Sequence, residues 1–354
     1  SAEAKALGIK MGVPYFQVQH FERRGRLKVF SSNYELYADL SRRMMETISS
    51  LVPAIEVYSI DECFADLSGM ANLSKIGHQI KERVYRWVGI PTCVGIAPTK
   101  TLAKFCNHLA KQYPKHFGGV VVWADWPAHI QQRALASQPM SEVWGIGSRT
   151  AAKLGKQGII TALDFINADT YTLRGRYGVV VERVQRELQG MPCHELELIT
   201  EKRQHIVRSR SFGTAVTEIE DLQAAISHHI SSGAEKLRKE HTQACMLSVF
   251  IQTNRFRIEQ PQYYGHQVTS IFPTSDTILL HRVAQQLLSA IYRSGFSYKK
   301  CGIELGGIES VRQDDLFDTP TSHDELMLSI DKINAKYGRN TISFASERLG
   351  HQWQ

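Results

Sequence analysis

The sequence predicts an α+β protein assembled from several modules, and two patterns support this prediction. Segments with an apolar residue at every third or fourth position, typical of helices, are interleaved with short alternating segments, typical of strands. Over the first third of the chain the order is helix, strand, strand, helix, strand, as in a split β-α-β unit, and a similar order returns after residue 200. With 354 residues, the chain is long enough for roughly two to four domains.

Composition narrows the class of protein. Apolar residues make up 43% of the chain, a normal share for a globular protein, so disorder is not expected. The net charge of +7 favours a polyanionic partner but indicates no chemistry. The six cysteines form no Cys-x-x-Cys pair, which argues against zinc and redox motifs. Because no apolar run approaches the ~20 residues that span a bilayer, we expect a soluble, cytoplasmic protein.

The elements of the first 130 residues follow from periodicity and from breaker residues. Residues 1–30 combine a short helical pattern, a Gly-Val-Pro turn and a basic stretch. The elements expected next are a helix over Asn33–Leu51, a hairpin of Ile55–Ile60 with Cys63–Leu67, a helix from Leu73 to Val84, a strand over Cys93–Ile96 and a helix over Thr99–Lys111. A helical pattern is already under way at Ser1 and the split unit lacks its first strand, so we expect a strand before Ser1 to complete the sheet.

The remaining residues divide into a helical part, a second α/β part and a tail. Residues 131–200 are expected to be mostly helical around the glycine-rich turn Val143–Gly147. The elements expected in residues 201–310 are strands at His205–Gly213, Ala244–Thr253, Val268–Phe272 and Lys300–Gly306, with helices at Leu222–Glu240 and Thr277–Arg293. Residues 311–354 form the tail.

Two adjacent acids, Asp61 and Glu62, occupy the tip of the predicted hairpin. Neighbouring residues point to opposite faces of an ideal strand, but at a tight turn both carboxylates can approach one cation. Carboxylates that hold Mg²⁺ are what phosphoryl transfer requires. Asp66, further along the hairpin, is a weaker candidate. The spacing alone also fits an ordinary solvated turn.

Two motifs around this turn resemble those of the Y-family translesion DNA polymerases. The segment Tyr58–Phe64 (Tyr-Ser-Ile-Asp-Glu-Cys-Phe) resembles a palm motif of that family, and Gly95–Lys104 resembles the next one. The resemblance implies that Asp61 and Glu62 are catalytic and ligate Mg²⁺ in a two-metal nucleotidyl transfer site. It also implies that Lys100 contacts the triphosphate. Lys100 starts a predicted helix, where free backbone N–H groups favour an anion.

The resemblance extends along the chain and implies a right-hand polymerase. Residues 1–30 would be part of small fingers, 31–130 a ferredoxin-like palm, 131–200 a thumb with a helix-hairpin-helix, 201–310 an α/β little finger, and 311–354 a tail. The first eight residues resemble the fingers segment whose basic residue reaches the incoming triphosphate, here Lys5. An ordinary surface lysine is an equally good interpretation of Lys5.

Contacts with DNA are expected in the thumb and the little finger. The thumb motif implies that Gly145 and Gly147 let backbone N–H groups approach a DNA phosphate, with Lys153 nearby. The little-finger strand would bind template phosphates through Arg208, Arg210 and Ser211. The alternatives are a plain glycine turn and a basic edge strand that protects against aggregation.

The tail contains a short motif that resembles the sliding-clamp motif of bacterial polymerases. Its side chains Gln313, Leu316 and Phe317 would fill pockets on the clamp, and an exposed Leu-Phe pair favours a partner. The segment around Ser211 and the tail are similar to the polymerase V branch of the family. That similarity implies primer-template DNA, deoxynucleoside triphosphates, the clamp, the processed accessory dimer of polymerase V and a recombinase filament as partners.

The function implied is low-fidelity DNA synthesis past lesions, within the SOS response and DNA repair. The family's palm begins with a strand that carries a third carboxylate and an aromatic steric gate, and neither is present in these 354 residues. We therefore expect inefficient nucleotide addition by this chain. The rival hypothesis is a non-catalytic damaged-DNA-binding remnant of such a polymerase. A nucleotide cyclase built on a similar palm would leave the thumb and little finger without a purpose.

Overall fold

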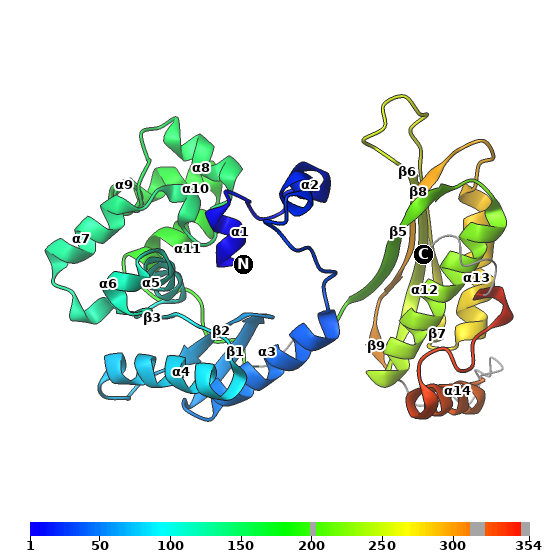
Figure 1. Cartoon of the computed structure of the whole chain (residues 1–354), viewed down its shortest axis with the longest axis horizontal. Helices are drawn as coiled ribbons and strands as arrows, with labels where there is room; N and C mark the ends of the chain where they lie inside the picture. The colour runs from blue at the N-terminus through cyan, green and yellow to red at the C-terminus, as the bar shows by residue number, and fades with distance from the viewer. Residues whose placement is uncertain (199–202, 312–322, 348–354) are drawn as a thin grey trace. The chain divides into compact units, whose positions relative to one another are not determined.

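The computed structural model describes residues 1–198, 203–311 and 323–347. The chain divides into two compact units, Ser1–Thr200 and Glu201–Gln354. Mixed helices and strands confirm the predicted α+β class (Figure 1). No helix in the described ranges has the length and apolar character needed to cross a membrane.

Unit 1 begins with helices and then forms a hairpin and a parallel strand pair. Its elements up to residue 125 are α1 Ala2–Ala6, α2 Tyr15–Arg23, α3 Tyr34–Ser49, β1 Ala54–Ser59, β2 Glu62–Asp66, α4 Leu73–Val88, β3 Val94–Ile96, α5 Lys100–Gln112, α6 Pro114–Phe117, β4 Val120–Val122 and the 3₁₀ helix η1 Trp123–Asp125. The predicted hairpin, its flanking helices and the strand β3 are confirmed. The helix α2 and the strand β4 were not predicted.

The strands of unit 1 form two separate pairs within the described residues, instead of the single sheet expected. β1 pairs with β2 in antiparallel fashion, and β3 pairs with β4 in parallel. β4 is buried along its whole length and β3 in part, which explains why β4 shows a continuous valine run with no alternation.

Helices α3 and α4 form one layer against the hairpin. Asn33 caps α3, because its side chain accepts a hydrogen bond from the Leu36 N–H. The apolar face of α3 packs with the apolar face of α4 in a buried cluster that contains Met44, Ile48, Ile80 and Val84. The methionines and isoleucines thus occupy the helical spacing that the sequence predicts.

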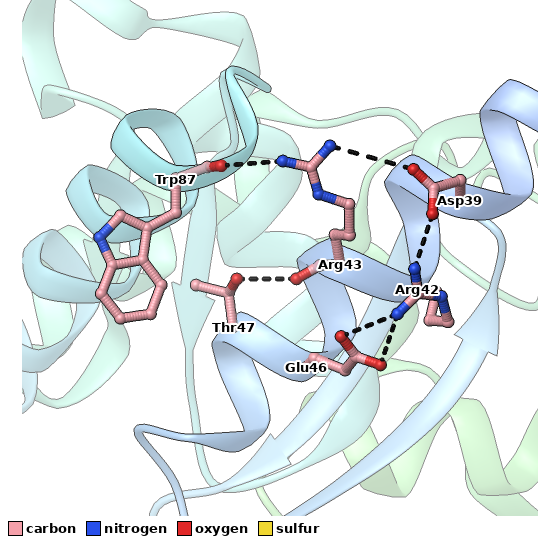
Figure 2. A network of polar contacts seen from close by, with 6 residues as sticks. All are labelled: Asp39, Arg42, Arg43, Glu46, Thr47 and Trp87. Carbon is pink, nitrogen blue, oxygen red and sulfur yellow. Dashed lines mark hydrogen bonds and ion pairs between the residues drawn. The ribbon is translucent and has the colours of Figure 1, made fainter.

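A polar network lies on the exposed side of α3, and one of its hydrogen bonds reaches the end of α4 (Figure 2). The Arg42 guanidinium pairs with Asp39 at 2.7 Å and with Glu46 at 2.9 Å. The Arg43 guanidinium donates to the Trp87 carbonyl at 3.3 Å, near the end of α4. Since the first two pairs are exposed, we attribute the register of the two helices mainly to their buried apolar faces.

The described rest of unit 1 is mostly helical up to Leu188, as predicted for residues 131–200. Its elements are α7 Ala128–Ser137, the 3₁₀ helix η2 Met140–Glu142, α8 Ser148–Gly155, α9 Ala162–Asn167, α10 Thr170–Tyr177 and α11 Val179–Leu188. Apolar residues of these helices share one buried cluster with α5, including Leu102, Leu109, Leu154, Phe165 and Leu188. This common core joins α5 to the helical part of the unit.

Unit 2 is an antiparallel sheet with helices on one face (Figure 1). Its elements are β5 His205–Val216, α12 Ile219–Lys239, β6 Thr242–Thr253, β7 Tyr264–Thr274, α13 Thr277–Ile291, β8 Tyr298–Gly306, β9 Glu309–Ser310, α14 Asp324–Tyr337 and the 3₁₀ helix η3 Ala345–Glu347. The sheet order is β5-β8-β6-β7, with β9 paired to β6. The core lies between the sheet and the helices α12 and α13, where Ile226, Ile230, Leu288 and Ile303 are fully buried.

The helix α14 was not predicted, and it is anchored to the helical layer of unit 2. Met327 is the buried apolar residue of α14. The Arg238 guanidinium of α12 binds both oxygens of Asp331, at 2.6 and 2.8 Å. The buried carboxylate of Asp276 accepts from His323 at 2.7 Å, and the buried Glu347 accepts from Ser231 at 2.8 Å. These contacts attach residues 323–347 to the helical layer through His323, Asp331 and Glu347.

Candidate active site

The two predicted acids lie at the turn between β1 and β2. Asp61 is exposed at the turn, and Glu62 is the first residue of β2. The Ser59 hydroxyl donates to an Asp61 carboxylate oxygen at 2.6 Å and accepts from the Asp61 N–H at 3.3 Å. The strand register is irregular between Val57 and Ser59. This local irregularity, together with the serine, fixes the turn that presents Asp61.

The hairpin has one apolar face and one face of polar and aromatic residues. Ile55, Cys63 and Ala65 pack on the cluster formed with α3 and α4. Glu56 and Phe64 are buried and lie directly opposite each other in the strand register. Because side chains alternate along a strand, Glu56 and Phe64 share the face that does not carry Ile55 and Ala65.

Lysines of α5 meet the carboxylates of the hairpin. Lys100 forms an ion pair with Glu56. The Lys104 ammonium lies 2.6 Å from Glu62 Oε2, and that of Lys111 lies 3.7 Å from Glu62 Oε1. These three lysines of α5 therefore all face the hairpin. Three of the five groups were not among the predicted site residues: Glu56, Lys104 and Lys111.

A second buried carboxylate holds the beginning of α5. Glu187, the penultimate residue of α11, accepts hydrogen bonds from the Thr101 N–H at 2.9 Å and from the Cys193 N–H at 2.7 Å. The Thr99 hydroxyl donates to the Glu187 carbonyl at 2.7 Å. A negative charge at a helix N-terminus is favourable, so Glu187 stabilises the position of α5. Sequence spacing gave no indication of this contact between residues so far apart.

An aromatic cluster connects the hairpin with the glycine-rich turn. The Trp144 indole N–H donates to the Tyr58 hydroxyl at 3.1 Å. The Trp144 ring also lies 5.7 Å from the ring of Phe64. The predicted thumb motif therefore contacts the predicted palm hairpin through side chains of the two motifs themselves.

The glycine-rich turn has the geometry that its glycines suggest, although the element before it is the short 3₁₀ helix η2 and not a full helix. Gly145 has φ +87, a left-handed conformation, and an added Cβ would lie 2.9 Å from Val184 Cγ2. Gly147 precedes α8 as its N-cap residue, with open space around its Cα. Lys153 is exposed on α8.

Two further candidates of unit 1 lie apart from the lysine–carboxylate contacts. Lys5 is exposed on the five-residue helix α1. Asp66 is the last residue of β2, where its carboxylate accepts from the Ser68 N–H at 2.8 Å. Hydrogen bonds from Ser68 lower the pKa of Asp66.

The three candidates of unit 2 lie on β5, which is an edge strand. Arg208, Arg210 and the buried Phe212 occupy every second position of β5, so their side chains lie on the same side of the strand. Ser211 points to the opposite side. Burial, followed by the neighbouring His228 and the two arginines, lowers the pKa of His229 to about 4. These three residues therefore do not share one face of the strand.

The clamp-motif residues Gln313, Leu316 and Phe317 lie outside the described residues. Within the described ranges, no group of three or more His, Cys, Asp or Glu residues is arranged to hold a metal ion. The acidic turn thus offers two carboxylates, Asp61 and Glu62.

The fold resembles that of solved Y-family DNA polymerases. The structure resembles a Y-family DNA polymerase chimera of Dbh and Dpo4, with a TM-score of 0.67 and 20% identity over 88% of this chain and 87% of that one. It also resembles a Dbh DNA polymerase in an insertion ternary complex, with a TM-score of 0.51 and 19% identity over 87% and 86% of the two chains. This likeness shows the right-hand fold of the Y-family polymerases.

Sequence comparison identifies the family. Residues 1–108 match the impB/mucB/samB family, residues 203–316 match its C-terminal domain, and residues 324–354 match a domain of unknown function, DUF4113. The protein UmuC of Salmonella typhimurium is 43% identical over all of this chain and 85% of its own length. The protein MucB of Escherichia coli is 40% identical over 99% and 84% of the two chains. A DNA polymerase IV of Caulobacter vibrioides is 27% identical over 85% and 72%. The chain therefore belongs to the impB/mucB/samB family of UmuC-like Y-family DNA polymerases.

Proposed function

We propose that this chain carries out template-directed DNA synthesis past lesions, with the chemistry located at the Asp61–Glu62 turn. The observation that supports this most is the contact between that turn and α5, where Glu62 of the first palm motif meets Lys104 of the second. The reaction is attack of a primer 3′-hydroxyl on a deoxynucleoside triphosphate, which depends on positioning and charge stabilisation.

The two carboxylates fit one Mg²⁺ ion. Mg²⁺ in polymerase-type sites is usually bound through one or two carboxylates together with substrate phosphates and waters. Asp61 is exposed and can reach such an ion, whereas both oxygens of Glu62 face lysine ammonium groups. Glu62 must exchange at least one of these contacts to bind a cation. The ion would lower the pKa of the attacking hydroxyl and neutralise phosphate charge. The low catalytic efficiency expected from two carboxylates stays a prediction.

The remaining candidates are assigned to the substrates. Lys100 would bind the triphosphate from the start of α5, and Lys5 would bind it from α1. In the thumb, the backbone of Gly145 and Gly147 and the side chain of Lys153 would contact DNA phosphates, since free N–H groups at a glycine turn suit that contact. In the little finger, the side chains of Arg208, Arg210 and Ser211 would bind template phosphates.

Partner binding is proposed on the resemblance to the polymerase V branch. Gln313, Leu316 and Phe317 would bind the sliding clamp. The processed accessory dimer and the recombinase filament would bind elsewhere on the chain. The finer division into fingers, palm, thumb, little finger and tail is proposed on the same basis.

Primer extension on a template with an abasic site tests the proposed function. The wild-type chain is expected to add nucleotides only with Mg²⁺, and Asp61→Asn is expected to lower the single-turnover rate at least about 100-fold. Asp66→Asn is the matched control, because Asp66 lies at the other end of β2. DNA binding without Mg²⁺-dependent extension would favour the non-catalytic remnant instead.

A further inference from the structure

The connection between β6 and β7 is long for an antiparallel hairpin. β6 ends at Thr253 and β7 begins at Tyr264, so residues 254–263 form the connection, which extends past the end of the sheet (Figure 1). Hairpin loops usually have about two to five residues, and longer loops without secondary structure are often binding loops. Two large apolar side chains of this connection take no part in the core of unit 2, since Phe256 is 79% exposed and Ile258 is 91% exposed.

The connection is held in a defined turn by its own polar groups. The Asn254 side chain accepts from the Phe256 N–H at 3.1 Å, and the Asn254 carbonyl accepts from the Arg257 N–H at 3.0 Å. The side-chain amide of Gln262 lies 3.1 Å from the Asn254 carbonyl and 2.9 Å from the Arg257 carbonyl. Because the carbonyl groups are bound within the turn, the side chains of residues 255–258 are left exposed to solvent.

The exposed residues of this turn combine positive charge with an aromatic ring. Arg255 and Arg257 flank Phe256, and the Arg255 guanidinium lies 4.9 Å from the centre of the Phe256 ring. In the part of the chain that the structure describes, no carboxylate forms an ion pair with either arginine. Both guanidinium groups therefore remain available to an anion, and the exposed ring keeps surface for a second planar group.

The end of the connection meets a row of side chains that includes a proposed DNA contact. In the sheet register, Tyr264 lies opposite Gln252, Gln252 lies opposite Lys300, and Lys300 lies opposite Ser211. Directly opposite residues share one face of a sheet, so this row leads from Ser211 to the first residue of β7. Tyr264 is exposed, and its ring stacks on that of His266. The exposed turn therefore adjoins a sheet face that already carries a lysine and aromatic rings.

We infer that the turn at residues 255–258 binds unpaired DNA of the template strand, with Phe256 as the stacking residue and Arg255 and Arg257 as the phosphate-binding residues. The inference rests on the proposed function, because it takes a DNA template as the substrate. Proteins that bind single strands combine basic groups along the backbone with aromatic side chains on which the bases stack. A base within a duplex has both faces covered by its neighbours, so an exposed stacking ring favours an unpaired strand.

The test measures the Kd of the full chain for two DNA duplexes by fluorescence anisotropy. One duplex carries a single-stranded 5′ template overhang of about ten thymidines, and the other is blunt-ended. The wild type is expected to bind the overhang DNA more tightly. Phe256→Ala is expected to weaken binding of the overhang DNA at least about fivefold and to leave the Kd of the blunt DNA unchanged. Phe256→Trp keeps a ring and should retain the wild-type Kd. The matched control is Tyr337→Ala, since Tyr337 is an exposed ring on α14.

The salt dependence of binding tests the two arginines separately from the ring. Each phosphate contact with a single strand contributes about 0.7 to the slope of the logarithm of the binding constant against the logarithm of salt concentration. The double variant of Arg255→Gln and Arg257→Gln should therefore reduce the magnitude of this slope by about 1.4 on the overhang DNA. Lys239→Gln is the matched control, since Lys239 is exposed in the last turn of α12, and it should leave the slope unchanged. Circular dichroism checks that each variant is folded.

Each other outcome overturns the inference in a distinguishable way. Equal losses on the overhang DNA and the blunt DNA would assign the turn to the duplex. Unchanged Kd values in Phe256→Ala and in the arginine double variant would assign the turn to another class of partner, such as an acidic protein segment, and would leave the proposed function standing. A wild-type chain that binds both DNAs equally would exclude a contact with the overhang. A wild-type chain that binds neither DNA would overturn the proposed function as well.

Discussion

Replacement of Gly145 by alanine is expected to destabilise unit 1 by an amount that the structure allows us to work out. The φ of +87 puts the new side chain in a left-handed conformation, which costs about 1–2 kcal/mol. The new Cβ would lie 2.9 Å from Val184 Cγ2 in the buried core, and such overpacking costs about 1–3 kcal/mol. The lower entropy of the unfolded chain offsets about 0.4–1 kcal/mol. The net loss is therefore about 1–5 kcal/mol.

The matched control lies two residues away. Gly147 has an ordinary backbone conformation and open space around its Cα, so Gly147→Ala is expected to change the free energy of unfolding by less than about 0.5 kcal/mol. Urea unfolding followed by circular dichroism measures both values. If Gly147 approaches a DNA phosphate, its variant should also bind DNA severalfold more weakly while remaining stable. Equal stability of the two variants would refute the conformational reasoning.

Three further predictions concern buried polar groups. Arg238→Ala removes the two-fold contact with Asp331, so residues 324–347 should become more susceptible to limited proteolysis, while an unchanged cleavage pattern would show that other contacts suffice. Glu187→Gln leaves a weaker acceptor for the Thr101 N–H at the start of α5 and for the Cys193 N–H, and the free energy of unfolding should fall by about 1–3 kcal/mol in a urea titration. The folded-state pKa of His229 is about 4, below its ordinary value of 6.5, so the unfolded state binds more protons between these values. Stability from this group is therefore present above pH 6.5 and lost as the pH falls toward 4, by up to about 3 kcal/mol, and His229→Gln should flatten that part of the stability–pH curve.

The sequence was sufficient for elements with a strong local pattern. The helix α3 and the hairpin β1–β2 follow directly from the spacing of their apolar residues and from Pro53. The helix α2 escaped prediction because it buries no residue in this structure, so it has no apolar stripe facing a core. β4 escaped because three consecutive buried valines show no alternation.

The candidate site was predictable only in part, for a physical reason. Asp61, Glu62 and Lys100 belong to two local motifs that the sequence displays. The partners Glu56 and Glu187 act through contacts between residues distant in sequence, and local spacing carries no information about those contacts. The one local indication was Glu56 itself, a charged residue within an otherwise apolar strand segment.

The measurement that tests the central claim most directly is the binding of Mn²⁺, followed by electron paramagnetic resonance. The full chain would be bound to primer-template DNA and to a deoxynucleoside triphosphate with an imido group between the α and β phosphates, which cannot react. Mn²⁺ would take the place of Mg²⁺. A metal centre at the Asp61–Glu62 turn predicts nucleotide-dependent Mn²⁺ binding in the wild type and in Asp66→Asn, and its loss in Asp61→Asn. Equal Mn²⁺ binding in all three proteins, or binding that does not depend on the nucleotide, would contradict the assignment of the catalytic site to this turn.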